Sequence, residues 1–124
     1  MNLVLTYRPK MKANDVINDI WLKSMASTKK EFLKKLFSVF LRDEPDRVHK
    51  IRDALQTGEM DKLKFLAHSL KGAAATMGAD RVKEACLDLE RSALAGNTDQ
   101  AYKDMLVLEH EMKSVYDFMS EFIK

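Results

Sequence analysis

The chain has 124 residues, of which 46% are hydrophobic and 32% charged, with 4 Gly and 2 Pro. This length fits one domain with a modest core, and the composition argues against disorder and against an all-β fold. The formal net charge of +2 is too close to zero to indicate, by itself, binding to nucleic acid or to a membrane.

Membrane anchoring and disulfide bonding are not expected either. The single Cys86 has no partner for an internal disulfide, and no second Cys is present for a zinc motif. No stretch has the apolar length of a membrane span, and the first residues lack the pattern of a signal peptide. We therefore expect a soluble, cytoplasmic protein.

The N-terminal region is expected to contain a tail and a first helix. Residues 1–11 alternate loosely and include Pro9, which predicts an extended tail followed by one helical domain over residues 12–124. From Met11 to Met25, apolar residues recur at helical spacing: Ala13, Val16, Ile17, Ile20 and Trp21. The run SMAST then breaks this pattern, with Ser27 or Thr28 as the predicted N-cap of the next helix.

A long second helix is predicted from Lys29 to Gln56. Its apolar stripe consists of Leu33, Phe37, Phe40, Val48, Ile51 and Leu55. Pro45 lies within it and has no backbone N–H, so we expect a kink or short break near Arg42 to Glu44. Gly58 is predicted to end this helix as a C-cap residue.

Two further helices follow at short intervals. The third runs from Asp61 to Met77 and ends at Gly78; its apolar residues are Leu63, Leu66, Ala67, Leu70, Ala73, Ala74 and Met77. Asp80 is predicted to cap a fourth helix that reaches about Ala95 and has an inward face of Val82, Ala85, Cys86, Leu89 and Ala93.

The last helix is predicted from Asp99 to about Phe122. Its apolar residues recur in steps of three and four: Tyr102, Met105, Leu108, Met112, Val115, Met119 and Phe122. Because the connections are short, consecutive helices should be antiparallel neighbours. The predicted fold is all-α: an antiparallel up-down four-helix bundle with an additional N-terminal helix over one end.

One histidine lies on the exposed side of the third helix. At about 100° per residue, His68 points about 160° away from the centre of the apolar stripe at Leu70. The same exposed face carries Lys64, Lys71, Gly72 and Ala75, with Phe65 at its edge. A glycine within a helix is unfavourable by roughly 0.5 to 1 kcal/mol relative to alanine, so Gly72 either lets a partner approach closely or is an accidental surface glycine.

The exposed face suits phosphoryl chemistry. Neutral imidazole is a good nucleophile near physiological pH, since its ordinary pKa is about 6.5. A phosphoryl group on His68 would lie one turn from Lys71, whose charge can stabilise it, and Lys64 is also near.

The run AHSLKGAAATMGADRV, followed by LDLE, resembles the signature of histidine-containing phosphotransfer (HPt) domains of bacterial phosphorelays. The resemblance covers about residues 28–122, including the stretch EFLKKLFSVFLRDEPDRVHKIRDALQTGEMDKLKFLAHSLKG. It implies a phosphoacceptor role for His68, charge stabilisation by Lys71, partner clearance at Gly72 and orientation of the imidazole by Glu90.

The resemblance also implies partners and a reaction. The protein would accept a phosphoryl group from a receiver-domain aspartate and pass it to another receiver, without kinase activity of its own. Its partners would be the receiver domains of response regulators and hybrid sensor kinases, which bring the Mg²⁺, so we expect no bound cofactor or metal. Lys64, Phe65 and Ala75 would contribute to the interface, and the protein is expected to be a monomer. The sequence is compatible both with a free-standing shuttle and with a segment of a larger hybrid kinase.

The chain offers fewer features for other sites and functions. His49 has no neighbouring ligand pattern, and His110, between Glu109 and Glu111, is more typical of a solvated helix face than of a metal site. No glycine-rich phosphate loop or nucleophile elbow occurs. The rival functions are a helical adaptor that binds through the His68 face without phosphorylation, and an RNA-binding protein that uses the cluster Lys29, Lys30, Lys34 and Lys35.

Overall fold

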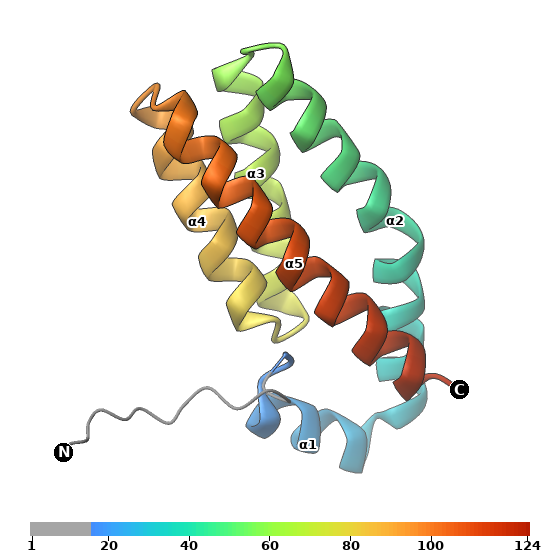
Figure 1. Cartoon of the computed structure of the whole chain (residues 1–124). Coiled ribbons are helices and arrows are strands. Elements are labelled where there is room, and N and C mark those ends of the chain that lie inside the picture. The colour runs from blue at the N-terminus through green and yellow to red at the C-terminus, as the bar shows by residue number, and fades with distance from the viewer. Residues whose placement is uncertain (1–15) are drawn as a thin grey trace, which may run out of the picture.

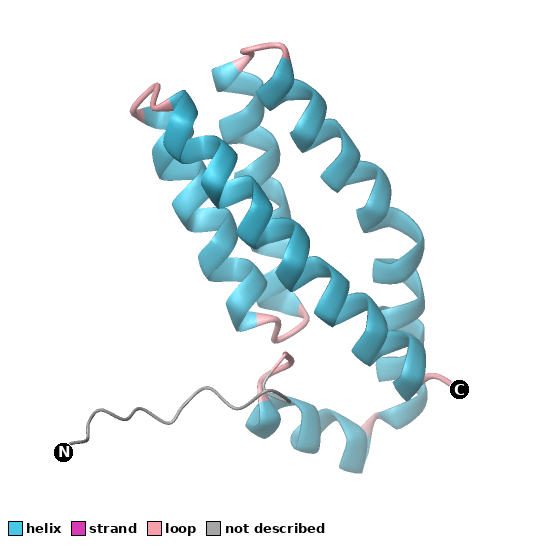
Figure 2. Ribbon diagram, in the orientation of Figure 1, coloured by secondary structure: helices cyan, strands magenta, loops and turns pink. Residues whose placement is uncertain are grey.

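The computed structural model describes residues 16–124, and within this part of the chain it contains helices and short connections but no strand (Figure 1, Figure 2). The helices are α1 (Asp19–Thr28), α2 (Lys30–Gln56), α3 (Met60–Thr76), α4 (Asp80–Leu94) and α5 (Thr98–Phe122). The predicted tail over residues 1–11, and the predicted start of the first helix at Met11, lie outside the described residues.

Helices α2 to α5 form the predicted antiparallel bundle. α3 packs against α4, α4 against α5, and α2 against both α3 and α5. α1 lies across one end of the bundle, near the α3–α4 turn, and packs against α2 (Figure 1). The all-α fold and the position of the additional helix are therefore confirmed. None of the described helices has the combination of length and apolar character that a membrane crossing requires.

The core forms where the apolar stripes of the helices meet. Its largest fully buried side chains include Phe37, Leu33, Ile51, Leu55, Leu63, Leu70, Leu89, Met105, Leu108, Met112 and Met119. Cys86 is also buried, as predicted, and its burial raises the pKa of the thiol to about 12. Tyr102 was predicted to face the core but is 41% exposed, because its neighbour Ala101 takes the inward position of α5.

The first helix begins later than its apolar pattern indicated. Val16 and Ile17 are buried, but they precede α1, and Ile20 is 82% exposed. Asn18 explains the change: its side chain accepts a hydrogen bond from the Trp21 backbone N–H at 2.9 Å and so caps the helix. A polar cap within an apolar run thus sets the helix start.

The α3–α4 turn is tied to the start of α1. The Asn18 backbone N–H donates to the Gly78 carbonyl at 2.7 Å, and the Asn18 side-chain amide donates to Asp80 Oδ2 at 2.9 Å. Gly78 has φ +70°, and a Cβ placed there would lie 2.9 Å from the Trp21 ring. Gly78 therefore ends α3 as predicted and also makes room for Trp21.

Two predicted N-caps are wrong. Ser27 and Thr28 belong to α1, and both hydroxyls donate back to the Ser24 carbonyl; the residue between α1 and α2 is Lys29, with φ −141°. Asp80 is the first residue of α4 rather than its cap, because its carboxylate binds Asn18 instead. The bond to Asn18 thus takes the Asp80 carboxylate that would have capped α4, whereas Ser27 and Thr28 lie too early in the chain to cap α2, because α1 continues to Thr28.

Pro45 does not interrupt α2. The helix continues from Lys30 to Gln56, so the short break considered near Arg42 to Glu44 is absent, and the ribbon of α2 bends along its length instead (Figure 2). Pro45 is exposed, so the helical hydrogen bond that its missing N–H removes is lost on the solvent side of the helix. As predicted, Gly58 follows the end of α2 with a positive φ of 75°.

Candidate functional site: the exposed histidine of α3

His68 lies on the exposed face of α3. The residues of α3 that point to the core are Leu63, Ala67, Leu70 and Ala74, all buried, and this arrangement turns His68 outward. The His68 side chain is 64% exposed. The helix thus fixes the backbone of the histidine while solvent or a partner can reach its ring.

Glu90 of α4 holds the imidazole in place. Its Oε2 lies 3.0 Å from His68 Nδ1, and its Oε1 accepts a hydrogen bond from Lys71 Nζ at 2.8 Å. The hydrogen bond from Lys71 is the main reason that the pKa of Glu90 lies below its ordinary value, and the His68 contact acts in the same direction. One carboxylate therefore joins the histidine and the lysine of the exposed face.

The contact with Glu90 determines which ring nitrogen is available. An ionised carboxylate only accepts hydrogen bonds, so we assign the proton of the neutral ring to Nδ1. Nε2 then carries the lone pair, at the far side of the ring from Glu90. The arrangement provides a nucleophile that needs no separate base.

Lys71 has an ion-pair partner that helical spacing within α3 does not predict. Its side chain is 25% exposed and is paired with Glu90, so this carboxylate partly neutralises the basic face expected around His68. A signal for this contact exists in the sequence. His68 and Glu90 are each 11 residues from Ala79, in the turn between α3 and α4, so an antiparallel helix pair brings them side by side.

The other predicted site residues near His68 on α3 differ in how exposed they are. Phe65 is 69% exposed, Gly72 and Ala75 are exposed, and Lys64 is half-buried. A Cβ at Gly72 would meet nothing within 4 Å. The fold therefore gives no packing reason for this glycine.

The remaining histidines lie in ordinary surroundings. His49 Nε2 is 3.5 Å from Asp53 Oδ2, and both side chains are exposed. Beside His110, Glu109 binds Arg52 of α2, whereas Glu111 binds Arg81 of α4, so the two carboxylates point to different helices. Within residues 16–124, no three His, Cys, Asp or Glu side chains are grouped as metal ligands.

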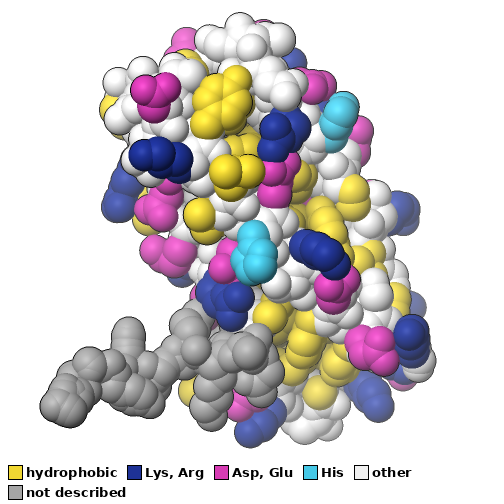
Figure 3. Space-filling model, in the orientation of Figure 1, with side chains coloured by type: hydrophobic (Ala, Val, Ile, Leu, Met, Phe, Trp, Pro, Cys, Tyr) yellow, Lys and Arg dark blue, Asp and Glu magenta, His cyan; other side chains and the backbone are white. Residues whose placement is uncertain are grey.

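Charge is mixed on one face of the bundle. On the face where α5 lies, basic and acidic side chains alternate with hydrophobic ones (Figure 3). This face therefore has no continuous basic patch of the kind that binds a nucleic-acid backbone.

Comparisons with known proteins agree with the geometry. The Hpt domain family model matches residues 35–117. Histidine-containing phosphotransfer protein 4 of Arabidopsis thaliana is 26% identical over 82 residues, which span 64% of this chain and 65% of that protein.

Solved structures of the same kind are also similar. Histidine-containing phosphotransfer protein B from Pseudomonas aeruginosa PAO1 superposes with a TM-score of 0.80 at 28% identity, over 87% of this chain and 94% of that one. A histidine-containing phosphotransfer protein from maize gives a TM-score of 0.78 at 19% identity, over 91% and 86% of the two chains, which supports the fold.

Proposed function

Because the chain belongs to the Hpt family, a family of histidine phosphotransfer domains, we propose that it is a phosphorelay intermediate that carries a phosphoryl group on His68. The group would come from the aspartyl phosphate of one receiver domain and pass to the aspartate of another. The observation that carries this proposal is the exposed His68 ring, bound through Nδ1 to Glu90.

The transfer step follows from this arrangement. The Nε2 lone pair attacks the phosphorus of the aspartyl phosphate; an N–P bond forms, the P–O bond to the aspartate breaks, and the carboxylate leaves with the bonding electrons. No proton has to leave Nε2, and the Nδ1 proton stays on the ring, hydrogen-bonded to Glu90. The ring gains positive charge in this step, and the Glu90 carboxylate stabilises it. Transfer to a second receiver is the reverse reaction.

Lys71 would stabilise the phosphoryl group once it is in place. Its ammonium is bound to Glu90, near the imidazole, and it can contact a phosphoryl oxygen by a short movement of a flexible side chain. The receiver would supply the Mg²⁺, so we propose that this protein needs no cofactor of its own. Gly72 would let the receiver approach, with Lys64, Phe65 and Ala75 in the interface.

Transfer from a phosphorylated receiver tests this function. A radiolabelled receiver domain of the source organism is mixed with the full chain, and acid-labile label is followed on both proteins. We expect the label to move to the wild type and not to a His68→Gln variant that is folded by circular dichroism. Absence of transfer from every receiver would instead favour a non-catalytic adaptor, whereas label on His68→Gln would show that another residue is the phosphoacceptor.

A further inference from the structure

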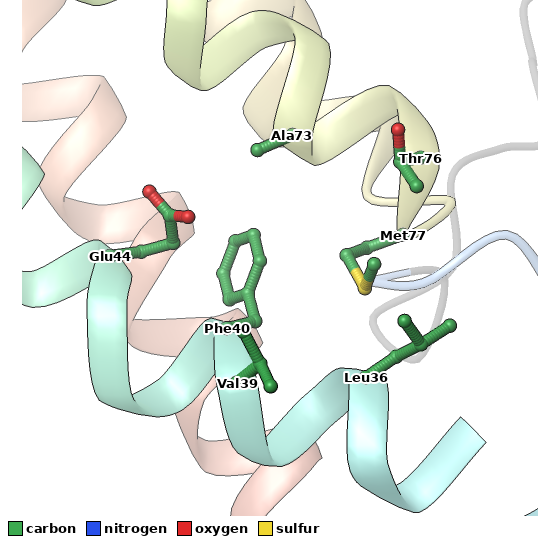
Figure 4. Close-up of a pocket in the computed structure, with 7 residues that line it drawn as sticks. All are labelled: Leu36, Val39, Phe40, Glu44, Ala73, Thr76 and Met77. Carbon is green, nitrogen blue, oxygen red and sulfur yellow. The ribbon is translucent and has the colours of Figure 1, made fainter. Parts of the chain in front are cut away.

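A small pocket lies between α2 and α3, beside the face that carries His68. It measures about 240 Å³ and is lined by Leu36, Val39, Phe40, Glu44, Ala73, Thr76 and Met77 (Figure 4). Apart from Glu44 and the Thr76 hydroxyl, these side chains are apolar. Pockets that hold drug-sized ligands measure roughly 300 to 1,000 Å³, so this one is of a size for a single side chain.

Glu44 is the unusual member of this lining. The residue is only 6% exposed, although a carboxylate is seldom buried without full pairing. Its buried Oε1 accepts no hydrogen bond from the described residues; Arg47 Nε lies 3.0 Å away as an ion pair without hydrogen-bond geometry. Burial raises the pKa of Glu44, and the Arg47 charge opposes that shift. The carboxylate thus retains capacity for a further cationic donor.

We propose that this pocket receives a lysine side chain of the partner receiver domain, with its methylene chain against the apolar walls and its ammonium on Glu44. The inference rests on the proposed phosphotransfer function. Arg47 already occupies one side of the carboxylate, so a compact ammonium fits the remaining space better than a second planar guanidinium.

The position of the pocket places it within reach of the same partner. Ala73 and Thr76 follow His68 on α3 by five and eight residues, or about 7 to 12 Å along the helix axis. A specific interface covers roughly 800 Å² on each partner, equivalent to a disc of about 16 Å radius. A receiver centred on His68 therefore extends over Gly72 to the mouth of the pocket, where Thr76 is exposed and Val39 is 44% exposed.

A titration with n-butylammonium, which has the structure of a lysine side chain, tests the pocket directly. Backbone amide spectra of the full chain are recorded with n-butylammonium and with n-butanol, its neutral isostere. We expect saturable shifts at Ala73, Thr76 and Met77, with tighter binding of the ammonium in the wild type and loss of that preference in Glu44→Gln. The proposal would be contradicted by the absence of saturable shifts, or by the same preference for the ammonium in Glu44→Gln. It would also be contradicted by shifts on dilution without ligand, which would indicate that a second copy of the chain occupies the pocket.

Phosphotransfer tests whether the pocket serves the partner. Glu44→Gln should slow transfer from the receiver by about tenfold or more, because a buried charge pair across the interface is lost. Glu84→Gln, which removes the same charge from an exposed position of α4, should transfer at the wild-type rate. Thr76→Trp, which fills the mouth of the pocket, should also slow transfer. Because this variant leaves Glu44 in place, it tests the pocket independently of the carboxylate.

Chemical labelling separates the two possible failures. Phosphoramidate, a small phosphodonor, should label His68 equally in the wild type, Glu44→Gln and Thr76→Trp, because it needs no protein interface. Undiminished receiver transfer in both variants, with intact labelling, would overturn the docking role of the pocket. A chain that binds n-butylammonium but accepts no label from any donor would instead overturn the phosphotransfer function on which this inference rests.

Discussion

Glu90 Oε2 lies 3.0 Å from His68 Nδ1, so a carboxylate of α4 holds the histidine that we propose as the phosphoacceptor of α3. The same carboxylate binds Lys71 through its other oxygen at 2.8 Å. Any change at Glu90 therefore affects both the orientation of the imidazole and the position of the nearest ammonium.

Replacing Glu90 should slow phosphoryl transfer without removing it. Glu90→Ala releases Nδ1, so the ring loses its fixed tautomer and orientation, and transfer from a receiver should slow by about tenfold to a hundredfold. Glu90→Gln keeps an amide oxygen that can accept a hydrogen bond from Nδ1–H, so this variant should slow the transfer less than Glu90→Ala does. Single-turnover transfer rates measure both; equal rates in wild type and Glu90→Ala would show that the contact does not matter for transfer.

Lys71 should control the titration of Glu90. The Lys71 hydrogen bond holds the pKa of Glu90 below its ordinary value of 4.5, so the stability from this pairing is present above that value and is lost as pH falls through the lower, folded-state pKa. Lys71→Gln should move the Glu90 titration and this loss of stability to higher pH. Carbon-13 NMR of the carboxyl group gives the titration, and an unchanged midpoint would contradict the pairing.

Gly72 should reduce the stability of the isolated protein while favouring its interaction with a partner. Gly72→Ala meets no atom within 4 Å and should stabilise the protein by about 0.5 to 1 kcal/mol, because alanine is the better helix former. The added methyl group should nevertheless slow transfer from a receiver, with phosphoramidate labelling unchanged. Urea unfolding gives the stability; a destabilised variant would assign Gly72 a structural role instead.

Gly78 should be required for the docking of α1. Gly78→Ala adds a Cβ at φ +70° that lies 2.9 Å from the Trp21 ring, whereas Gly58→Ala, at φ +75°, has open space around it. Both variants should lose about 1 to 2 kcal/mol to backbone strain, and Gly78→Ala a further 1 to 3 kcal/mol to overpacking. Urea unfolding compares them, with Trp21 fluorescence as a local probe. Equal losses would mean that the ring moves aside freely.

The bundle could be predicted from sequence because each of its four helices has an apolar stripe of helical period. The stripe of α3, centred on Leu70, also predicted that His68 faces outward. The ends of the helices were harder to predict, because they depend on contacts between residues that are distant in sequence. Asn18 caps α1 while it binds Gly78 and Asp80 at the α3–α4 turn, and no local sequence pattern predicts these hydrogen bonds.

The sequence predicted which residues of α3 form the site, but it did not predict how the charged side chains pair or which of them are buried. His68, Lys71 and Gly72 share a face by helical spacing alone. That Glu90 would bind both His68 and Lys71 depends on the register between α3 and α4. Glu44 lies within a polar stretch of sequence, and its burial follows from the packing of α2 against α3, which helical period alone does not specify.

The position of the phosphoryl group on the protein decides whether His68 is the phosphoacceptor. The full chain is phosphorylated by a receiver, digested under neutral or basic conditions and analysed by mass spectrometry, and the intact product is examined by phosphorus-31 NMR. We predict one phosphoryl group, on Nε2 of His68. A phosphoryl group on Nδ1, on His49 or His110, or on none of the histidines would contradict it.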